Sequence, residues 1–188
     1  MGSSFAPSRA PPEAVDAPTP APTKLALLAT TGLTVAAVVT FVLWRGPGAV
    51  DAGFAAGFLC VFSGLFILRV AGQVLVRTRR PAWLPPTERW NLTPYRLLLP
   101  TQLLFIALMA WIDVDFARDS GFWVDARPAF GRAVLWFAYA YASAMAVRYV
   151  VRMGRQPDQR WFGGTIPIVF HWVLASFLFV LGSFHASH

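Results

Sequence analysis

Apolar residues are gathered into five runs of about twenty residues each, separated by shorter polar segments. An α-helix rises about 1.5 Å per residue, so about 20 apolar residues cross the hydrocarbon core of a bilayer. Runs of this length with few charges inside them are typical of membrane-spanning helices. We therefore predict an all-α fold, a polytopic membrane helix bundle with about five transmembrane helices, at residues 25–44, 52–70, 94–112, 130–151 and 164–184.

Glycines, prolines and charged residues separate the runs. Arg45-Gly-Pro-Gly follows the first run, and the second continues as an amphipathic helix to Arg77. Pro81, Pro85 and Pro86 then interrupt the chain, because proline lacks the backbone N–H that a helix interior needs. The segments between the runs are too short to hold a soluble domain.

The first 23 residues have a different composition, with six prolines and two acids. Such a segment cannot bury enough apolar surface to fold, so we expect a disordered, Pro-rich cytoplasmic tail over 1–23, followed by the five-span bundle over 24–188. A cleavable signal peptide is the alternative, because Lys24 precedes an apolar run. That run is longer than the usual apolar region of about 7–15 residues, which favours a first span that is retained.

The overall composition also indicates a membrane protein. Of the 188 residues, 56% are hydrophobic and 13% are charged, and the mean hydropathy is +0.53. A soluble domain has about 25% charged residues, so this chain has too little polar surface to cover a water-soluble globule. The scarcity of lysine beside abundant alanine, arginine, glycine and proline is typical of a GC-rich bacterial genome, and we predict a multi-pass protein of the inner membrane. The single cysteine, Cys60, excludes an intramolecular disulfide and a cysteine-based zinc site.

The net charge of +7 comes from fifteen arginines and one lysine. Most lie near the ends of the apolar runs, where they orient the spans and contact anionic lipids, so we expect no nucleic-acid partner. With five spans, one side carries twelve basic residues, and the other carries four basic residues and five aspartates. The positive-inside rule then predicts a cytoplasmic N-terminus and an outer C-terminus. The twelve are Arg9, Lys24, Arg69, Arg77, Arg79, Arg80, Arg89, Arg96, Arg148, Arg152, Arg155 and Arg160.

Small residues recur every four positions in two of the predicted spans. They are Ala52, Ala56, Cys60 and Gly64 in the second span, and Ala138, Ala142 and Ala146 in the fourth. Small side chains at this spacing allow helix backbones to approach closely in lipid. We expect these two spans to pack against each other; the alternative is a homo-oligomer or an interface with another membrane protein.

Two histidines lie fourteen residues apart in the fifth span. His171 is about 10 Å inside the cytoplasmic end and His185 lies near the outer end, on nearly the same face. Cytochrome b-type bundles hold two stacked haems with this spacing. Each haem needs a second axial ligand, which only a dimer of the chain could supply. We therefore predict no cofactor, with haem as the alternative, and expect His171 to be hydrogen-bonded within the bundle.

Arginines near the cytoplasmic ends of the spans are candidates for anion binding. Guanidinium groups suit phosphate oxygens, so these residues predict either simple head-group anchoring or a pocket for an anionic lipid or isoprenoid phosphate. The candidates are Arg96, Arg148, Arg77, Arg79 and Arg80.

Asp113 and Asp115 form an Asp-x-Asp pair, a spacing that can hold a divalent cation. They are expected on the outer side, away from the arginines, in a solvated loop. We therefore predict no metal site.

Two classes of function remain open. The chain carries no Gly-x-Ser-x-Gly, His-Glu-x-x-His or phosphate-binding glycine loop, and no predicted span has an acid in its middle. The sequence therefore favours a non-enzymatic accessory or scaffold subunit that packs through small-residue helix faces. The alternative is a small membrane enzyme or redox carrier that acts on a lipid-soluble or isoprenoid-phosphate substrate through a cytoplasmic-side Arg/His site.

Overall fold

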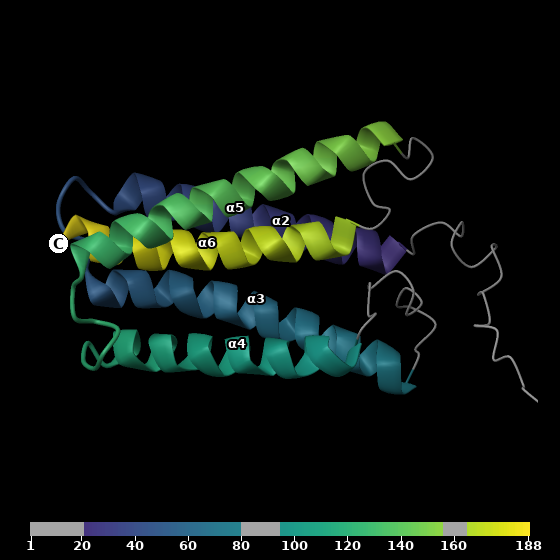
Figure 1. Cartoon of the computed structure of the whole chain (residues 1–188), viewed down its shortest axis with the longest axis horizontal. Coiled ribbons are helices and arrows are strands. Elements are labelled where there is room, and N and C mark those ends of the chain that lie inside the picture. Colours follow the sequence, from purple (N-terminus) through teal and green to yellow (C-terminus); the bar gives the residue numbers. More distant parts are fainter. Residues whose placement is uncertain (1–20, 80–94, 156–164) are drawn as a thin grey trace, which may run out of the picture.

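The computed structural model describes residues 21–79, 95–155 and 165–188, and these residues form helices joined by short loops (Figure 1). No strand occurs in these three ranges, and all five helices are long and apolar enough to cross a membrane. The all-α prediction with five candidate spans is therefore confirmed. The helices are α2 (Ala21–Trp44), α3 (Ala52–Arg79), α4 (Tyr95–Ala117), α5 (Pro128–Arg155) and α6 (Thr165–Ser187).

Several helices extend beyond the predicted spans. α3 continues to Arg79, and α4 continues to Ala117. Asp113 and Asp115 therefore lie on a helix, and the prediction of a loop beginning at residue 113 is wrong. The described residues begin at position 21, so residues 1–20 of the predicted tail lie outside them.

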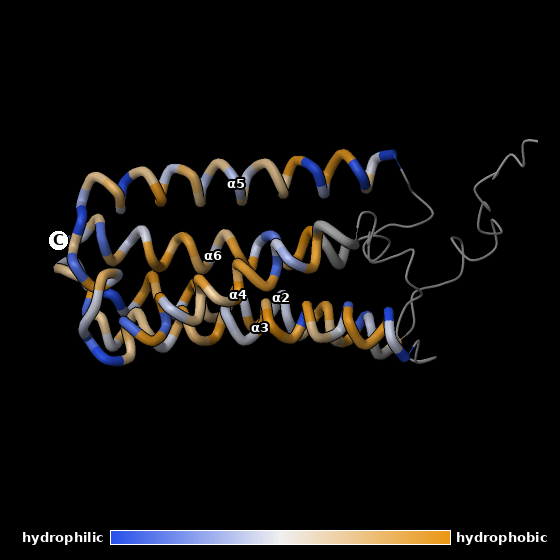
Figure 2. Tube along the Cα trace, turned by 60° about the horizontal axis from the view of Figure 1, so that its bottom comes forward, coloured by the Kyte–Doolittle hydropathy of each residue, from blue (hydrophilic) through white to orange (hydrophobic). Residues whose placement is uncertain are grey.

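α6 is the central helix of the bundle. It packs against α2, α3 and α5, whereas α4 packs mainly against α3, and α5 mainly against α6. Accordingly, α6 has the largest buried share of the five candidate spans and α5 the smallest. Figure 1 shows α5 crossing α6 near one end of the bundle and leaning away from it toward the C-terminal end of α5. The hydropathy colouring in Figure 2 shows apolar residues along all five helices, with polar residues concentrated at the ends of the bundle.

Aromatic side chains form much of the core between α2, α3, α4 and α6. Phe41, Phe62 and Phe116 are fully buried, and Phe177 is nearly so. The Phe116 ring lies edge-on to Phe184, with 4.7 Å between ring centroids. In lipid, helices gain little from leaving the solvent, so close packing of this kind provides much of the attraction between them.

The backbones of α5 and α6 are almost in contact near the C-terminus. A Cβ atom added to Gly131 would lie 2.3 Å from the backbone nitrogen of Ala186, and one added to Gly182 would lie 2.9 Å from that of Leu135. Both distances are shorter than a carbon–nitrogen contact allows, so glycine is required at both positions. These two glycines fix where α5 crosses α6.

The predicted packing of the second span against the fourth is wrong. In the described part of the chain, α3 and α5 do not form a packed helix pair, because α6 is the main partner of α5. Ala138 is buried at the α5–α6 contact, whereas Ala146 is exposed. The small residues of α3 are divided between two faces, with Ala52 and Ala56 buried and Gly64 exposed.

Candidate functional site

His171 and Tyr141 form a side-chain pair between α6 and α5. The Tyr141 hydroxyl and His171 Nδ1 share a hydrogen bond of 2.5 Å, and the two rings meet edge to face with 5.6 Å between centroids. Phe137, one turn before Tyr141, stacks on the phenol ring at 5.7 Å. The predicted hydrogen bond of His171 within the bundle is present, and its partner is a phenol.

Arg69 of α3 approaches the same pair. Its guanidinium lies 5.3 Å from the centre of the Phe170 ring, a cation–π contact, and is within electrostatic range of Tyr141 and His171. The Arg69 Nε is buried and makes no hydrogen bond among the described residues. Three helices therefore bring polar groups to one place, although α3 and α5 do not pack against each other.

Among the predicted anion-binding residues whose side chains are described, Arg148 is the nearest to His171, although its own side chain is exposed. It lies seven residues after Tyr141, on the same side of α5, and is within electrostatic range of His171. Arg77 and Arg79 are exposed, about 12–15 Å beyond Arg69 along α3. The side chains of Arg80 and Arg96 lie outside the described residues. We call Arg69, Tyr141, Arg148 and His171 the polar cluster.

The aspartates of the described chain do not contact the polar cluster. Four lie near the loops that join α2 to α3 and α4 to α5: Asp51, Asp115, Asp119 and Asp125. Asp113 lies deeper, beside Ser63 of α3, about 9 Å along that helix from Arg69. None of them can neutralise the cluster at close range.

His185 is packed against aromatic side chains at the end of α6. It is fully buried, with the rings of Phe130 and Phe184 each 5.2 Å away, and neither ring nitrogen has a hydrogen-bond partner among the described residues. A haem shared between two copies of α6 does not fit this arrangement. α6 is surrounded by three helices of its own chain, and His185 points into the bundle instead of toward a second copy.

Asp113 and Asp115 point in different directions. Residues that are two positions apart in a helix point about 200° away from each other. The two carboxylates accordingly have different partners. Asp115 accepts a hydrogen bond from the Trp123 backbone nitrogen at 3.2 Å, whereas Asp113 is half-buried beside Ser63 of α3. The pair therefore cannot chelate one cation, and the described residues include no group of three His, Cys, Asp or Glu side chains placed to do so.

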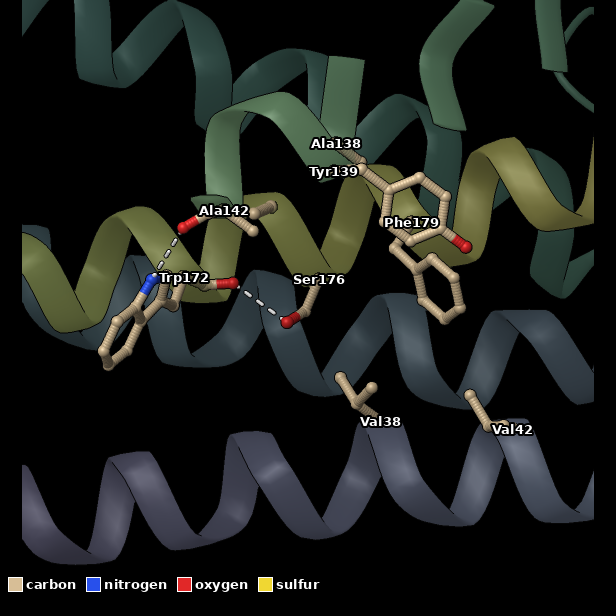
Figure 3. A pocket seen from close by; sticks show the side chains of 9 residues that line it. Val38, Val42, Ala138, Tyr139, Ala142, Trp172, Ser176 and Phe179 are labelled. Carbon is tan, nitrogen blue, oxygen red and sulfur yellow. Dashed lines mark hydrogen bonds between the residues drawn. The ribbon is translucent and has the colours of Figure 1, made fainter. Parts of the chain in front are cut away.

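An apolar groove of about 360 Å³ opens between α2 and α5, with α6 as its floor (Figure 3). Val38 and Val42 form one wall, and Ala138, Tyr139 and Ala142 the other. On the floor, the Trp172 indole donates to the Ala142 carbonyl oxygen at 3.3 Å, and Ser176 bonds to the backbone of its own helix. The groove has room for an apolar chain and presents few free polar groups.

A face of α3 carries small residues that are exposed in the described structure. Gly57, Cys60 and Gly64 are exposed, and a Cβ atom added to either glycine would meet nothing within 4 Å in the described structure. We call these three residues the α3 small face. It differs from Gly131 and Gly182, which a neighbouring backbone requires to be glycine.

Comparisons with known proteins add no functional assignment. No family model, curated protein or solved structure matches the chain. The polar cluster and the α3 small face are therefore the two features from which a function can be argued. The sequence pattern identified part of each, but not Arg69 or the exposure of Gly57. Arg69 could have been identified from the sequence because it is the only arginine within the predicted span 52–70.

Proposed function

We propose that this protein is a non-catalytic membrane subunit that associates with a second copy of itself through the α3 small face. The observation that supports this function is the exposure of Gly57, Cys60 and Gly64 along one side of a candidate membrane span. Small residues at this spacing are typical of faces where two transmembrane helices meet closely.

The glycines of this face make the α3 helix of a single chain less stable. Glycine in a helix is less stable than alanine by about 1 kcal/mol in water. Gly131 and Gly182 offset that cost through the close crossing of α5 and α6, whereas Gly57 and Gly64 have open space beside them in the described structure. A helix from another molecule, packed on this face, would give these two glycines the same role.

A second copy fits the symmetry of the face. Two copies with the same membrane orientation have parallel α3 helices, and a two-fold axis then brings the same residues together from both sides. Gly53 and Gly57 have the Gly-x-x-x-Gly spacing of close parallel crossings, and Cys60 lies one turn further along. In such a dimer, the two Cys60 side chains face each other near the axis.

Mild oxidation of membranes that contain the protein should therefore link two chains through Cys60. A disulfide needs Cβ atoms about 3.5–4.5 Å apart, a distance that a close crossing at this face provides. We expect most of the protein to run as a dimer on a non-reducing gel and as a monomer after reduction.

Two variants make the test specific. Gly57→Leu places a large side chain on the α3 small face and should reduce the cross-linked fraction at least tenfold. Gly32→Leu, at an exposed position on α2 with nothing within 4 Å in the described structure, should leave it unchanged. A chain that remains monomeric under oxidation, or that cross-links equally well in both variants, would contradict the proposal.

We further propose an inner-membrane location with the N-terminus in the cytoplasm. The distribution of charge supports this orientation. Arg77, Arg79 and Arg155 lie at one end of the bundle, and the described aspartates lie at the other. A reporter enzyme that is active only outside the cytoplasm should be active when fused after His188. The same reporter fused before residue 1 should be inactive, and the reverse pattern would overturn the orientation.

A further inference from the structure

The polar cluster is an unusual concentration of positive charge beside apolar helix surface. The Arg69 guanidinium lies over the ring of Phe170, the residue before His171, and His171 is itself hydrogen-bonded to Tyr141. A charged side chain within a membrane span is costly unless it is paired, and such residues commonly mark binding sites. The nearest described aspartate along α3 is Asp113, which lies beside Ser63, about 9 Å before Arg69 and on another side of the helix, so the described helices supply no close counter-charge for Arg69.

The arrangement of donors indicates the shape of that counter-charge. Arg69 approaches from α3, Arg148 and the Tyr141 hydroxyl from α5, and the His171 ring from α6. A phosphate group has oxygens that point in several directions and can accept from more than one side, and guanidinium groups bind it with paired N–H donors. A planar carboxylate suits a single arginine, whereas a phosphate can also accept from donors on neighbouring helices.

The position of the cluster indicates where the phosphate comes from. Arg69 lies ten residues, about 15 Å, before the end of α3, and His171 lies six residues, about 9 Å, after the start of α6. Phe170 covers one side of the Arg69 guanidinium, and Phe137 covers the Tyr141 ring. A phosphate attached to an apolar chain can reach this depth from the bilayer, whereas a free ion has to leave water to do so.

We propose that the polar cluster binds the phosphate head group of a membrane lipid, with Arg69 as the main contact and Arg148 as the second. The phosphate neutralises two arginines that have no nearby aspartate in the described chain. Tyr141 donates to a phosphate oxygen or holds His171 in place. This site lies apart from the α3 small face and does not depend on association of two copies.

The test is lipid binding by the purified full-length protein in detergent, measured by native mass spectrometry. Phosphatidylglycerol is the probe, and a glycolipid without phosphate is the comparison. We expect one phosphatidylglycerol per chain to remain bound at collision energies that remove the glycolipid. Excess inorganic phosphate should not displace it. Displacement by phosphate would show that the site recognises a free ion and would overturn the lipid assignment.

Variants distinguish this site from general attraction between lipid and a basic protein surface. Arg69→Gln should weaken phosphatidylglycerol binding about ten- to a hundredfold, because it removes a charge-assisted contact. Arg69→Lys keeps the charge but loses the paired donors, so its binding should be intermediate. Arg79→Gln, at an exposed position further along the same helix, should change binding less than twofold.

Tyr141→Phe tests the same site if Arg69→Gln does not fold. It removes a single oxygen and keeps the ring, so the fold should be unaffected. We expect it to weaken phosphatidylglycerol binding severalfold while the protein elutes as the parent chain does in size-exclusion chromatography. Equal lipid affinity in Tyr141→Phe, Arg79→Gln and the parent chain would overturn the proposal.

Discussion

Gly131→Ala should lower the free energy of unfolding by about 3 kcal/mol, the upper end of the range for adding a carbon to a packed site. The added methyl group would meet backbone atoms of His185 and Ala186, the nearest at 2.3 Å. Backbone atoms cannot turn aside as a flexible side chain can, so α5 would have to move away from α6. Because α6 is the main packing partner of α5, this displacement would loosen the whole helix.

The effect of Gly131→Ala can be measured as the midpoint of thermal unfolding in detergent. We expect a fall of roughly 6–12 °C, given the size of the chain. Gly154→Ala is the matched control, because it lies on the same helix with nothing within 4 Å in the described structure. The control should not lower the midpoint, since alanine is the better helix former. Equal midpoints for the two variants would show that α5 does not cross α6 at Gly131.

Phe116→Ala should cost about 3 kcal/mol, near the low end of the range for removing a buried phenylalanine. Phe116 is fully buried, and its ring contacts that of Phe184 on α6. Part of the usual cost in soluble proteins comes from transfer between water and the core, a term that is smaller when the alternative surroundings are lipid. The expected loss is therefore mainly that of packing contacts and of the cavity left behind.

Phe105→Ala provides the control for this loss. Phe105 lies on the same helix, three turns before Phe116, but is 41% exposed. Its removal should change the unfolding midpoint by less than a third of the change for Phe116→Ala. If Phe105→Ala were the more damaging of the two, the exposed side of α4 would be a packed surface in the folded protein.

The helices could be predicted from the sequence, but their neighbours could not. Runs of about twenty apolar residues identify spans because the thickness of the bilayer sets their length. The same runs contain little information on packing, since both lipid-facing and buried positions are apolar. The pairing expected from small residues in α3 and α5 was wrong for this reason. Small residues mark close approach, and the pattern alone does not identify the partner.

The candidate site could be predicted in part. His171 and Arg148 were identified because polar residues in an apolar run are costly. Arg69 was counted only as a charge that sets orientation, because its neighbour Phe170 lies on a helix about one hundred residues later in the chain. His185 was expected near the outer end of the fifth span, and its complete burial was not predicted. The structure buries it because Phe130 and Gly131, at the start of α5, pack against the end of α6.

The central place of α6 has a consequence for how the chain is made. Synthesis runs from the N-terminus, so α2, α3 and α4 are made before α5 and α6, and α3 can pair with α4 as soon as both exist. α5 has no main packing partner until α6 arrives, and α6 is the last helix of the described chain. Until then, the surfaces that α6 will cover on three helices are open to lipid and to other nascent proteins. Assembly of the described bundle is therefore completed only once α6, the last of its five helices to be made, packs between the others.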